Sequence, residues 1–146
     1  MSIFKSMNVS ASGLTAERLR MDVISENIAN ASVTRTLAGT PYRRKMVVFQ
    51  EQNGNSFQTL LDQARGINTT GDGVEVGGIV EDQSDFKRIY NPEHPDADDE
   101  GYVLMPNVDV VTEMINLMTA SRAYEANITA LNSAKSMAMK ALEIGR

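Results

Sequence analysis

The stretch NVDVVTEMINLMTASRAYEANITALNSAKSMAMKALEI, residues 107–144, decides the fold class of this chain. One row of side chains recurs there at every seventh position: Val110, Leu117, Tyr124, Leu131 and Ala138. This spacing is typical of a helix with a coiled-coil-like seam. Asn107 or Asp109 suits the start of such a helix, Gly145 suits its end, and neither Gly nor Pro interrupts it. The stretch therefore predicts one helix of about 57 Å, at 1.5 Å per residue.

A second long helix is predicted over residues 2–32. Two rows with the same seven-residue spacing run through it: Met7, Leu14, Met21 and Ile28, and beside them Val9, Ala16, Val23 and Asn30. Neither helix can bury its apolar surface alone, so we expect the two helices to pair with each other and then with other subunits. The alternative is a two-helix hairpin that folds only onto its own small domain.

The middle of the chain has the short, β-branched and Gly-punctuated segments that are typical of strands. Four stretches fit this description: PYRRKMVVFQ (41–50), GVEVGGIVED (73–82), FKRIY (86–90) and GYVLM (101–105). FQTLLDQA (57–64) is ambiguous between a strand and a helical turn. The predicted fold is mainly α with a small β-rich insert, an α+β class. The expected domains are an N-terminal axial helix (1–34), a β-rich middle domain (35–105) and a C-terminal axial helix (106–146).

The composition excludes several classes of function. The 146-residue chain contains no Cys, so disulfides and thiolate metal sites are impossible. Residues 51–105 carry twelve acidic and three basic side chains, which argues against nucleic acid as a partner. There is no apolar run long enough to span a membrane. The N-terminal residues lack the features of a cleaved secretory signal, so we expect export, if any, to leave the N-terminus intact.

Candidate chemical sites are weak. His94 lies in an acidic loop that resembles the start of a calcium loop, but the twelfth position is Asn107, where a bidentate Glu is needed. The glycines of residues 71–78 lack a following P-loop lysine. We therefore predict no catalytic residue, no cofactor and no metal site. The basic cluster of residues 43–45 either meets an acidic surface, for which the acidic middle zone of another copy is one candidate, or is a solvated strand edge.

Asn27 and Asn30 are polar residues close to the end of an apolar helix seam. They lie three residues apart, so they share one face of the helix. Polar residues in an apolar seam fix register and partner identity at some cost in stability. We expect this role for both asparagines, and the alternative is that both are simply exposed at a helix end.

The segment SGLTAERLRMDVISENIANASVT (12–34) resembles the N-terminal signature of the bacterial flagellar axial proteins of the rod and hook. SRAYEAN (121–127) resembles the C-terminal signature of the same family. PYRRKMVVFQ and YNPEHPDADDEGYVLMPNVD (90–109) are similar to one short member, a protein of the proximal rod. The resemblance extends over nearly the whole chain, and residues 51–72 match least well.

The resemblance implies a non-enzymatic subunit of the proximal rod, which assembles helically into the drive shaft that transmits torque. It implies export through the flagellar type III apparatus into the periplasm or cell wall, with the rod proteins FlgB, FlgF and FlgG and the adaptor FliE as neighbours. A helical adaptor or an export-chaperone-like module of a secretion apparatus is the alternative. From the seven-residue rows of the two helices and the family signatures, we expect the subunit interface to include eleven residues: Met7, Leu14, Met21, Asn27, Ile28, Asn30, Val110, Leu117, Tyr124, Asn127 and Leu131.

Overall fold

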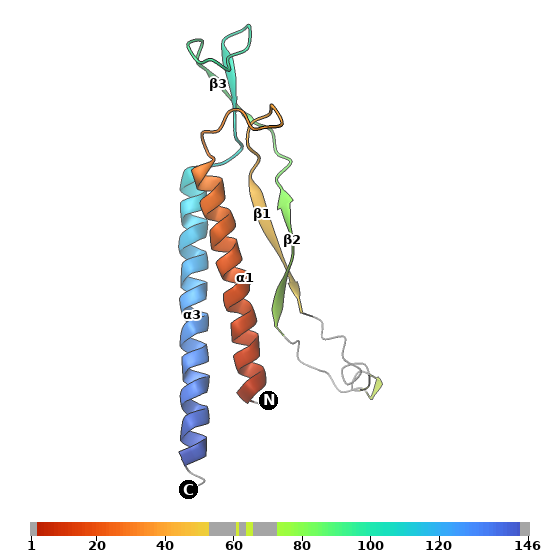
Figure 1. Cartoon of the computed structure of the whole chain (residues 1–146), viewed down its shortest axis with the longest axis vertical. Helices are drawn as coiled ribbons and strands as arrows, with labels where there is room; N and C mark the ends of the chain where they lie inside the picture. The colour runs from red at the N-terminus through yellow and green to blue at the C-terminus, as the bar shows by residue number, and fades with distance from the viewer. Residues whose placement is uncertain (1–2, 53–60, 62–63, 66–72, 144–146) are drawn as a thin grey trace. The chain divides into compact units, whose positions relative to one another are not determined.

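A computed structural model describes residues 3–52, 61, 64–65 and 73–143 of the chain (Figure 1). Its elements in chain order are α1 (Ile3–Ala29), β1 (Lys45–Glu51), β2 (Val74–Glu81), β3 (Lys87–Tyr90), β4 (Tyr102–Met105) and α3 (Val110–Glu143). The expected mixture of two long helices with a small β-rich insert is confirmed. The ambiguous stretch at residues 57–64 lies almost entirely outside the described residues.

Both helices have local reasons to begin and end where they do. The Asp109 carboxylate caps α3 by accepting a hydrogen bond from the Val111 N–H at 3.0 Å, and this bond lowers the pKa of Asp109. The 34 residues of α3 correspond to about 51 Å. The last turn of α1 closes with a hydrogen bond from the Asn30 N–H to the Glu26 carbonyl at 3.1 Å. Among the described helices, none has the length and apolarity that a membrane crossing requires.

Each of the four stretches expected to be strands contains one. β1 pairs with β2, and β3 pairs with β4, in two separate two-stranded sheets. The β3–β4 pair is antiparallel, with Tyr90 opposite Tyr102. The two tyrosine rings meet edge to face with their centroids 5.3 Å apart, and the Arg88 guanidinium lies 4.9 Å from the centre of the Tyr102 ring. These cross-strand contacts hold a hairpin of only four residues a side.

The contacts within the chain divide it into two compact units. The first comprises residues 1–18, 49–77 and 122–146, and the second comprises residues 19–48 and 78–121. Each unit therefore draws on both helices and on both strands of the β1–β2 pair. The division into two axial helices and a middle domain stays a prediction.

In the first unit, α1 lies close to both α3 and the start of β2. A Cβ atom on Gly13 would lie 3.0 Å from the Asn127 amide nitrogen, so glycine permits the close approach of the two helices. The Ser12 hydroxyl accepts a hydrogen bond from the Val74 N–H at 3.1 Å. Gly73 has a φ of +129°, and a Cβ there would overlap the Ser12 hydroxyl. Glycine is therefore required at position 73 on both counts.

The second unit contains most of the buried apolar side chains among the residues that the structure describes. Its buried residues of this kind are Val23, Ile24, Pro41, Tyr42, Val103, Pro106, Val108 and Ala120. They come from α1, α3, β4 and the segments that precede β1 and α3. This small core fixes the end of α1 against the start of α3.

The helix contact uses a row of small and polar residues that the sequence analysis did not choose as the main seam. On α3 the row consists of Glu113, Ala120, Asn127 and Ala134, all of which are buried except the half-buried Asn127. The expected main row on α3 is exposed at Val110 and half-buried at Leu117, Tyr124 and Leu131. Small side chains allow two helix axes to approach closely. The larger apolar side chains consequently lie beside the contact and stay accessible.

Candidate functional site

Asn27 is the best-satisfied polar side chain at the end of α1, and it is 1% exposed. Its amide nitrogen donates to the Lys45 carbonyl at 2.8 Å and to the Glu113 carboxylate at 2.9 Å. Its amide oxygen accepts from the Tyr42 hydroxyl at 3.0 Å and from the Lys45 N–H at 2.9 Å. A primary amide offers two donors and two acceptor sites, so every one of them is occupied.

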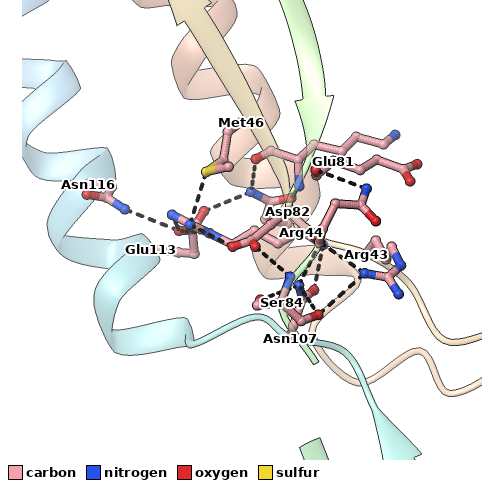
Figure 2. A network of polar contacts seen from close by, with 12 residues as sticks. Arg43, Arg44, Met46, Glu81, Asp82, Ser84, Asn107, Glu113 and Asn116 are labelled. Atoms are coloured by element: carbon pink, nitrogen blue, oxygen red, sulfur yellow. Dashed lines mark hydrogen bonds and ion pairs between the residues drawn. The ribbon is translucent and has the colours of Figure 1, made fainter. Parts of the chain in front are cut away.

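Glu113, in the first turns of α3, is also 1% exposed. One of its oxygens binds Asn27, and the other accepts from the Arg44 side chain at 2.7 Å and 3.0 Å and from Asn116 at 3.2 Å (Figure 2). Because the buried carboxylate has both a cation and amide donors, the cost of removing it from water is offset. We call Asn27, Tyr42, Arg44, Lys45 and Glu113 the Asn27–Glu113 cluster.

Asn107 extends this network to the turn that follows β2. Its amide oxygen accepts from the Arg44 N–H at 2.8 Å, and its amide nitrogen donates to the Asp82 carbonyl at 3.1 Å and the Ser84 hydroxyl at 2.9 Å (Figure 2). Asp82 also accepts from the Ser84 N–H at 2.9 Å, and this hydrogen bond lowers the pKa of Asp82. The network therefore ties the segment before α3 to the start of β1 and the end of β2.

Tyr42 closes the cluster on the side of β1. Its side chain is 8% exposed, and its hydroxyl donates to Asn27. Burial raises the pKa of Tyr42 to about 12, and the nearby carboxylates of Glu26, Glu113 and Glu81 act in the same direction. The phenol therefore stays a hydrogen-bond donor throughout the physiological range.

The raised pKa of Tyr42 predicts alkaline destabilisation. Tyrosine in the unfolded chain loses its proton near pH 10, whereas Tyr42 in the folded chain retains it to about pH 12. The contribution of Tyr42 to stability is complete below pH 10 and is lost as the pH rises from 10 to about 12. Absorbance titration of tyrosinate should show one of the four tyrosines titrating late. Tyr42→Phe should remove that late phase, and simultaneous titration of all tyrosines near pH 10 would contradict the prediction.

The contacts of the Asn27–Glu113 cluster hold segments of the chain in place. Its polar atoms have partners within the chain: the amide of Asn27 is saturated, and Lys45 pairs with Glu26 at 2.6 Å. No group of three or more potential metal-ligating side chains occurs among the residues that the structure describes. The cluster can hold the end of α1, the start of β1 and the first turns of α3 in one fixed register.

The residues that sequence analysis assigned to the interface occupy different environments. Asn30 differs from Asn27, because its amide donates to the Glu26 carbonyl of its own helix at 2.9 Å. The two amides therefore do not meet the same neighbour in the chain. Asn127 lies against Gly13. Seven others are half-buried: Met7, Leu14, Met21, Ile28, Leu117, Tyr124 and Leu131. Val110 is exposed.

The basic cluster of residues 43–45 has partners within its own unit. Arg44 binds Glu113, Lys45 binds Glu26, and the Arg43 guanidinium lies 4.4 Å from the centre of the Phe86 ring. Arg44 and Lys45 therefore do meet acidic side chains, and these belong to their own chain. Their acidic partners lie far away in the sequence, where spacing gives no signal. Contact with another copy stays a prediction.

Sequence reasoning singled out Arg44 as part of the basic cluster, but it assigned no site role to Tyr42, Asn107 or Glu113. Of these three, Glu113 carried a local signal: it lies seven residues before Ala120, in the row of small residues that continues to Ala134. An acidic side chain in a row that becomes buried requires a partner. Asn27 was singled out, although for contacts outside the chain.

Comparison with known proteins matches two regions of the chain, one of which contains Asn27 and the other Glu113. Residues 7–35 match the family described as "Flagella basal body rod protein", and residues 99–144 match "Flagellar basal body rod FlgEFG protein C-terminal". Relatives named "Flagellar basal-body rod protein FlgC" are 52% identical in Bacillus subtilis, 47% in Borreliella burgdorferi and 44% in Salmonella typhimurium. These alignments cover 99–100% of this chain and 98–100% of each relative.

Proposed function

Because the chain belongs to the family of the flagellar basal-body rod protein FlgC, it is a structural subunit of that rod, and we propose that it assembles through the exposed apolar faces of its long helices. We place it in the proximal rod, where helical assembly with other rod proteins builds the drive shaft that transmits torque. The proposal includes no catalytic activity.

One observation carries this proposal: α3 exposes many large apolar side chains although it packs through small ones. The exposed residues are Val111 (66%), Met114 (53%), Ile115 (52%), Met118 (55%), Met137 (59%), Met139 (56%) and Leu142 (78%). Contiguous exposed apolar surface marks interaction sites. The i, i+3, i+4, i+7 spacing of Val111, Met114, Ile115 and Met118 matches the anchors used between helices.

The eleven interface residues remain part of the proposal in two roles. The half-buried and exposed members contact neighbouring subunits directly. Asn27 acts indirectly, because it is buried in its own chain and fixes the position of both helices. A head-to-tail contact whose rotation does not close repeats into an open helical assembly, which suits a rod.

The neighbours and the route to the rod are proposals of the same kind. We propose contacts with FlgB, FlgF and FlgG and with the adaptor FliE. The subunit reaches the periplasm or cell-wall region through the flagellar type III export apparatus, without cleavage of a signal peptide. A helical adaptor or export-chaperone-like module is the second candidate. The rod subunit is favoured, because the relatives that align over nearly their whole length are named as a rod protein.

Replacing Leu117 or Leu131 with Asp tests the helix interface. Each is half-buried in the chain and would be buried further in a rod, where an unpaired charge is strongly penalised. We expect the number of complete rods to fall by at least about tenfold, because a loss of roughly 1.4 kcal/mol in one contact weakens binding tenfold. The measurement counts basal bodies with a full rod by electron microscopy in cells that lack the native copy.

Ser133→Asp is the matched control, because Ser133 is exposed on the same helix and two residues from Leu131. Because Ser133 lies one turn before the exposed Met137, this variant should lose fewer rods than either leucine variant. The amount of exported subunit and its helix content are measured for every variant, so that loss of export or folding is recognised. Complete rods at normal frequency in exported Leu117→Asp and Leu131→Asp variants would refute the interface.

A further inference from the structure

Lys135 interrupts an exposed, otherwise apolar row in the C-terminal half of α3. Ile128 lies seven residues before it and Leu142 seven residues after it, and Met139 lies on the same face one turn later. The exposed fractions are 37% for Ile128, 56% for Met139 and 78% for Leu142. Lys135 itself is exposed. All four residues belong to the first unit.

The Lys135 ammonium has no hydrogen-bond or ion-pair partner within the described part of the chain. This distinguishes it from Lys45, which pairs with Glu26 at 2.6 Å, and from Lys87, which donates to the Val108 carbonyl at 2.8 Å. Residues 126–142 contain two lysines and no acidic residue. The row that contains Lys135 therefore carries apolar side chains and one positive charge, with no acidic residue nearby in the sequence.

Helix-end effects do not account for a lysine at this position. Lys140 is in the last turn of α3, where a cation stabilises the helix through its dipole. Lys135 lies more than two turns before the end at Glu143, and the dipole effect falls off within the last turn. A single charged residue in an apolar seam instead specifies the partner and the register.

We propose that Lys135 binds a carboxylate carried by an apolar helix seam of a neighbouring rod subunit, and that this ion pair selects the correct neighbour. The inference rests on the proposed function, because the seam must be covered in the assembled rod. Covering it desolvates the ammonium, and the penalty is severe unless a carboxylate faces it. A wrong neighbour without that carboxylate is thereby excluded.

The test compares three substitutions in cells that lack the native copy. Lys135→Glu places a carboxylate against a carboxylate, and we expect at least about tenfold fewer complete rods, since like charges at an interface cost several kcal/mol. Lys135→Met keeps the length and removes the charge, and its loss should be smaller. Lys140→Glu is the control, since it makes the same charge change five residues away. It also removes a cation from the last turn of α3, so we expect some loss of rods, but a smaller one than in Lys135→Glu.

Suppressors of Lys135→Glu identify the partner. Selection for restored swimming should yield changes of Asp or Glu to Lys or Arg in a helix of a rod protein. Normal rod assembly by Lys135→Glu, or suppressors confined to position 135, would overturn the inference. Helix content and export of each variant are measured in parallel, so that a folding defect is not taken for lost pairing.

Ile128→Asp separates this inference from the proposed function. If Ile128→Asp abolishes rods while Lys135→Glu builds them normally, the row is an interface and only the ion pair is wrong. If Ile128→Asp also builds rods normally, this face is not an interface, and the proposed assembly through it is wrong as well. Loss of rods in both variants, with charge-reversal suppressors, supports both.

Discussion

Replacing Asn27 with leucine is expected to lower the free energy of unfolding by about 3–5 kcal/mol, at the upper end of single substitutions. Leucine leaves the Lys45 N–H and carbonyl, the Tyr42 hydroxyl and one Glu113 oxygen without the partner that they have in the native chain. Each buried group left unsatisfied costs roughly 1–3 kcal/mol. The better helix propensity of leucine returns only about 0.5 kcal/mol, so the loss dominates.

Asn30→Leu is the matched control, three residues away and one residue beyond the end of α1. Its amide is only half-buried and binds a carbonyl of its own helix, so the change should stay within about 1 kcal/mol. Urea unfolding of the full-length purified chain, followed by circular dichroism, measures both. Equal stabilities for the two variants would contradict the assignment of a structural role to Asn27.

Periodicity predicted the elements of this fold well because their causes are local. The seven-residue rows required a long helix over residues 107–144, and α3 extends from Val110 to Glu143. The β-branched stretch at residues 73–82 became β2. Helix capping by Asp109 could also be predicted, because the cap and the helix are adjacent in the sequence.

The choice among neighbouring helix rows could not be predicted from periodicity. Leu117 and Leu131 belong to a more apolar row than Ala120 and Ala134, yet the alanines are the more deeply buried. Within one chain the alanine row permits close helix packing, opposite residues such as Gly13. A subunit that also packs against other chains needs its large apolar residues elsewhere. A single sequence does not state which row faces which partner.

The Asn27–Glu113 cluster was beyond sequence reasoning for a different reason. Arg44 and Glu113 are 69 positions apart, and Asn27 and Glu113 are 86 apart. No spacing rule connects residues so distant, whereas the tertiary fold brings both to one place. The sequence shows that Asn27 is a polar residue in an apolar seam, but it does not show which residues Asn27 contacts.

Replacing Glu113 with leucine is expected to destabilise the chain by about 2–4 kcal/mol, because Arg44 would lose its closest counter-ion and Asn27 and Asn116 would each lose an acceptor. The value stays below that of a fully buried pair, since the Arg44 side chain is 23% exposed and Asp82 remains 3.5 Å away. Glu113→Gln keeps an acceptor and should lose about half as much. Urea unfolding again provides the measurement.

A double-mutant cycle with Arg44→Met separates the ion pair from the rest of the cluster. Removing both charges leaves no uncompensated ion, so the double variant Arg44→Met, Glu113→Leu should be more stable than the sum of the single losses implies, by about 1–3 kcal/mol. What remains of the Glu113→Leu loss after this coupling is subtracted is the share of Glu113 that serves Asn27 and Asn116. Strict additivity would mean that the 2.7 Å contact between Arg44 and Glu113 contributes no coupling, and that Glu113 acts on stability through the amides alone.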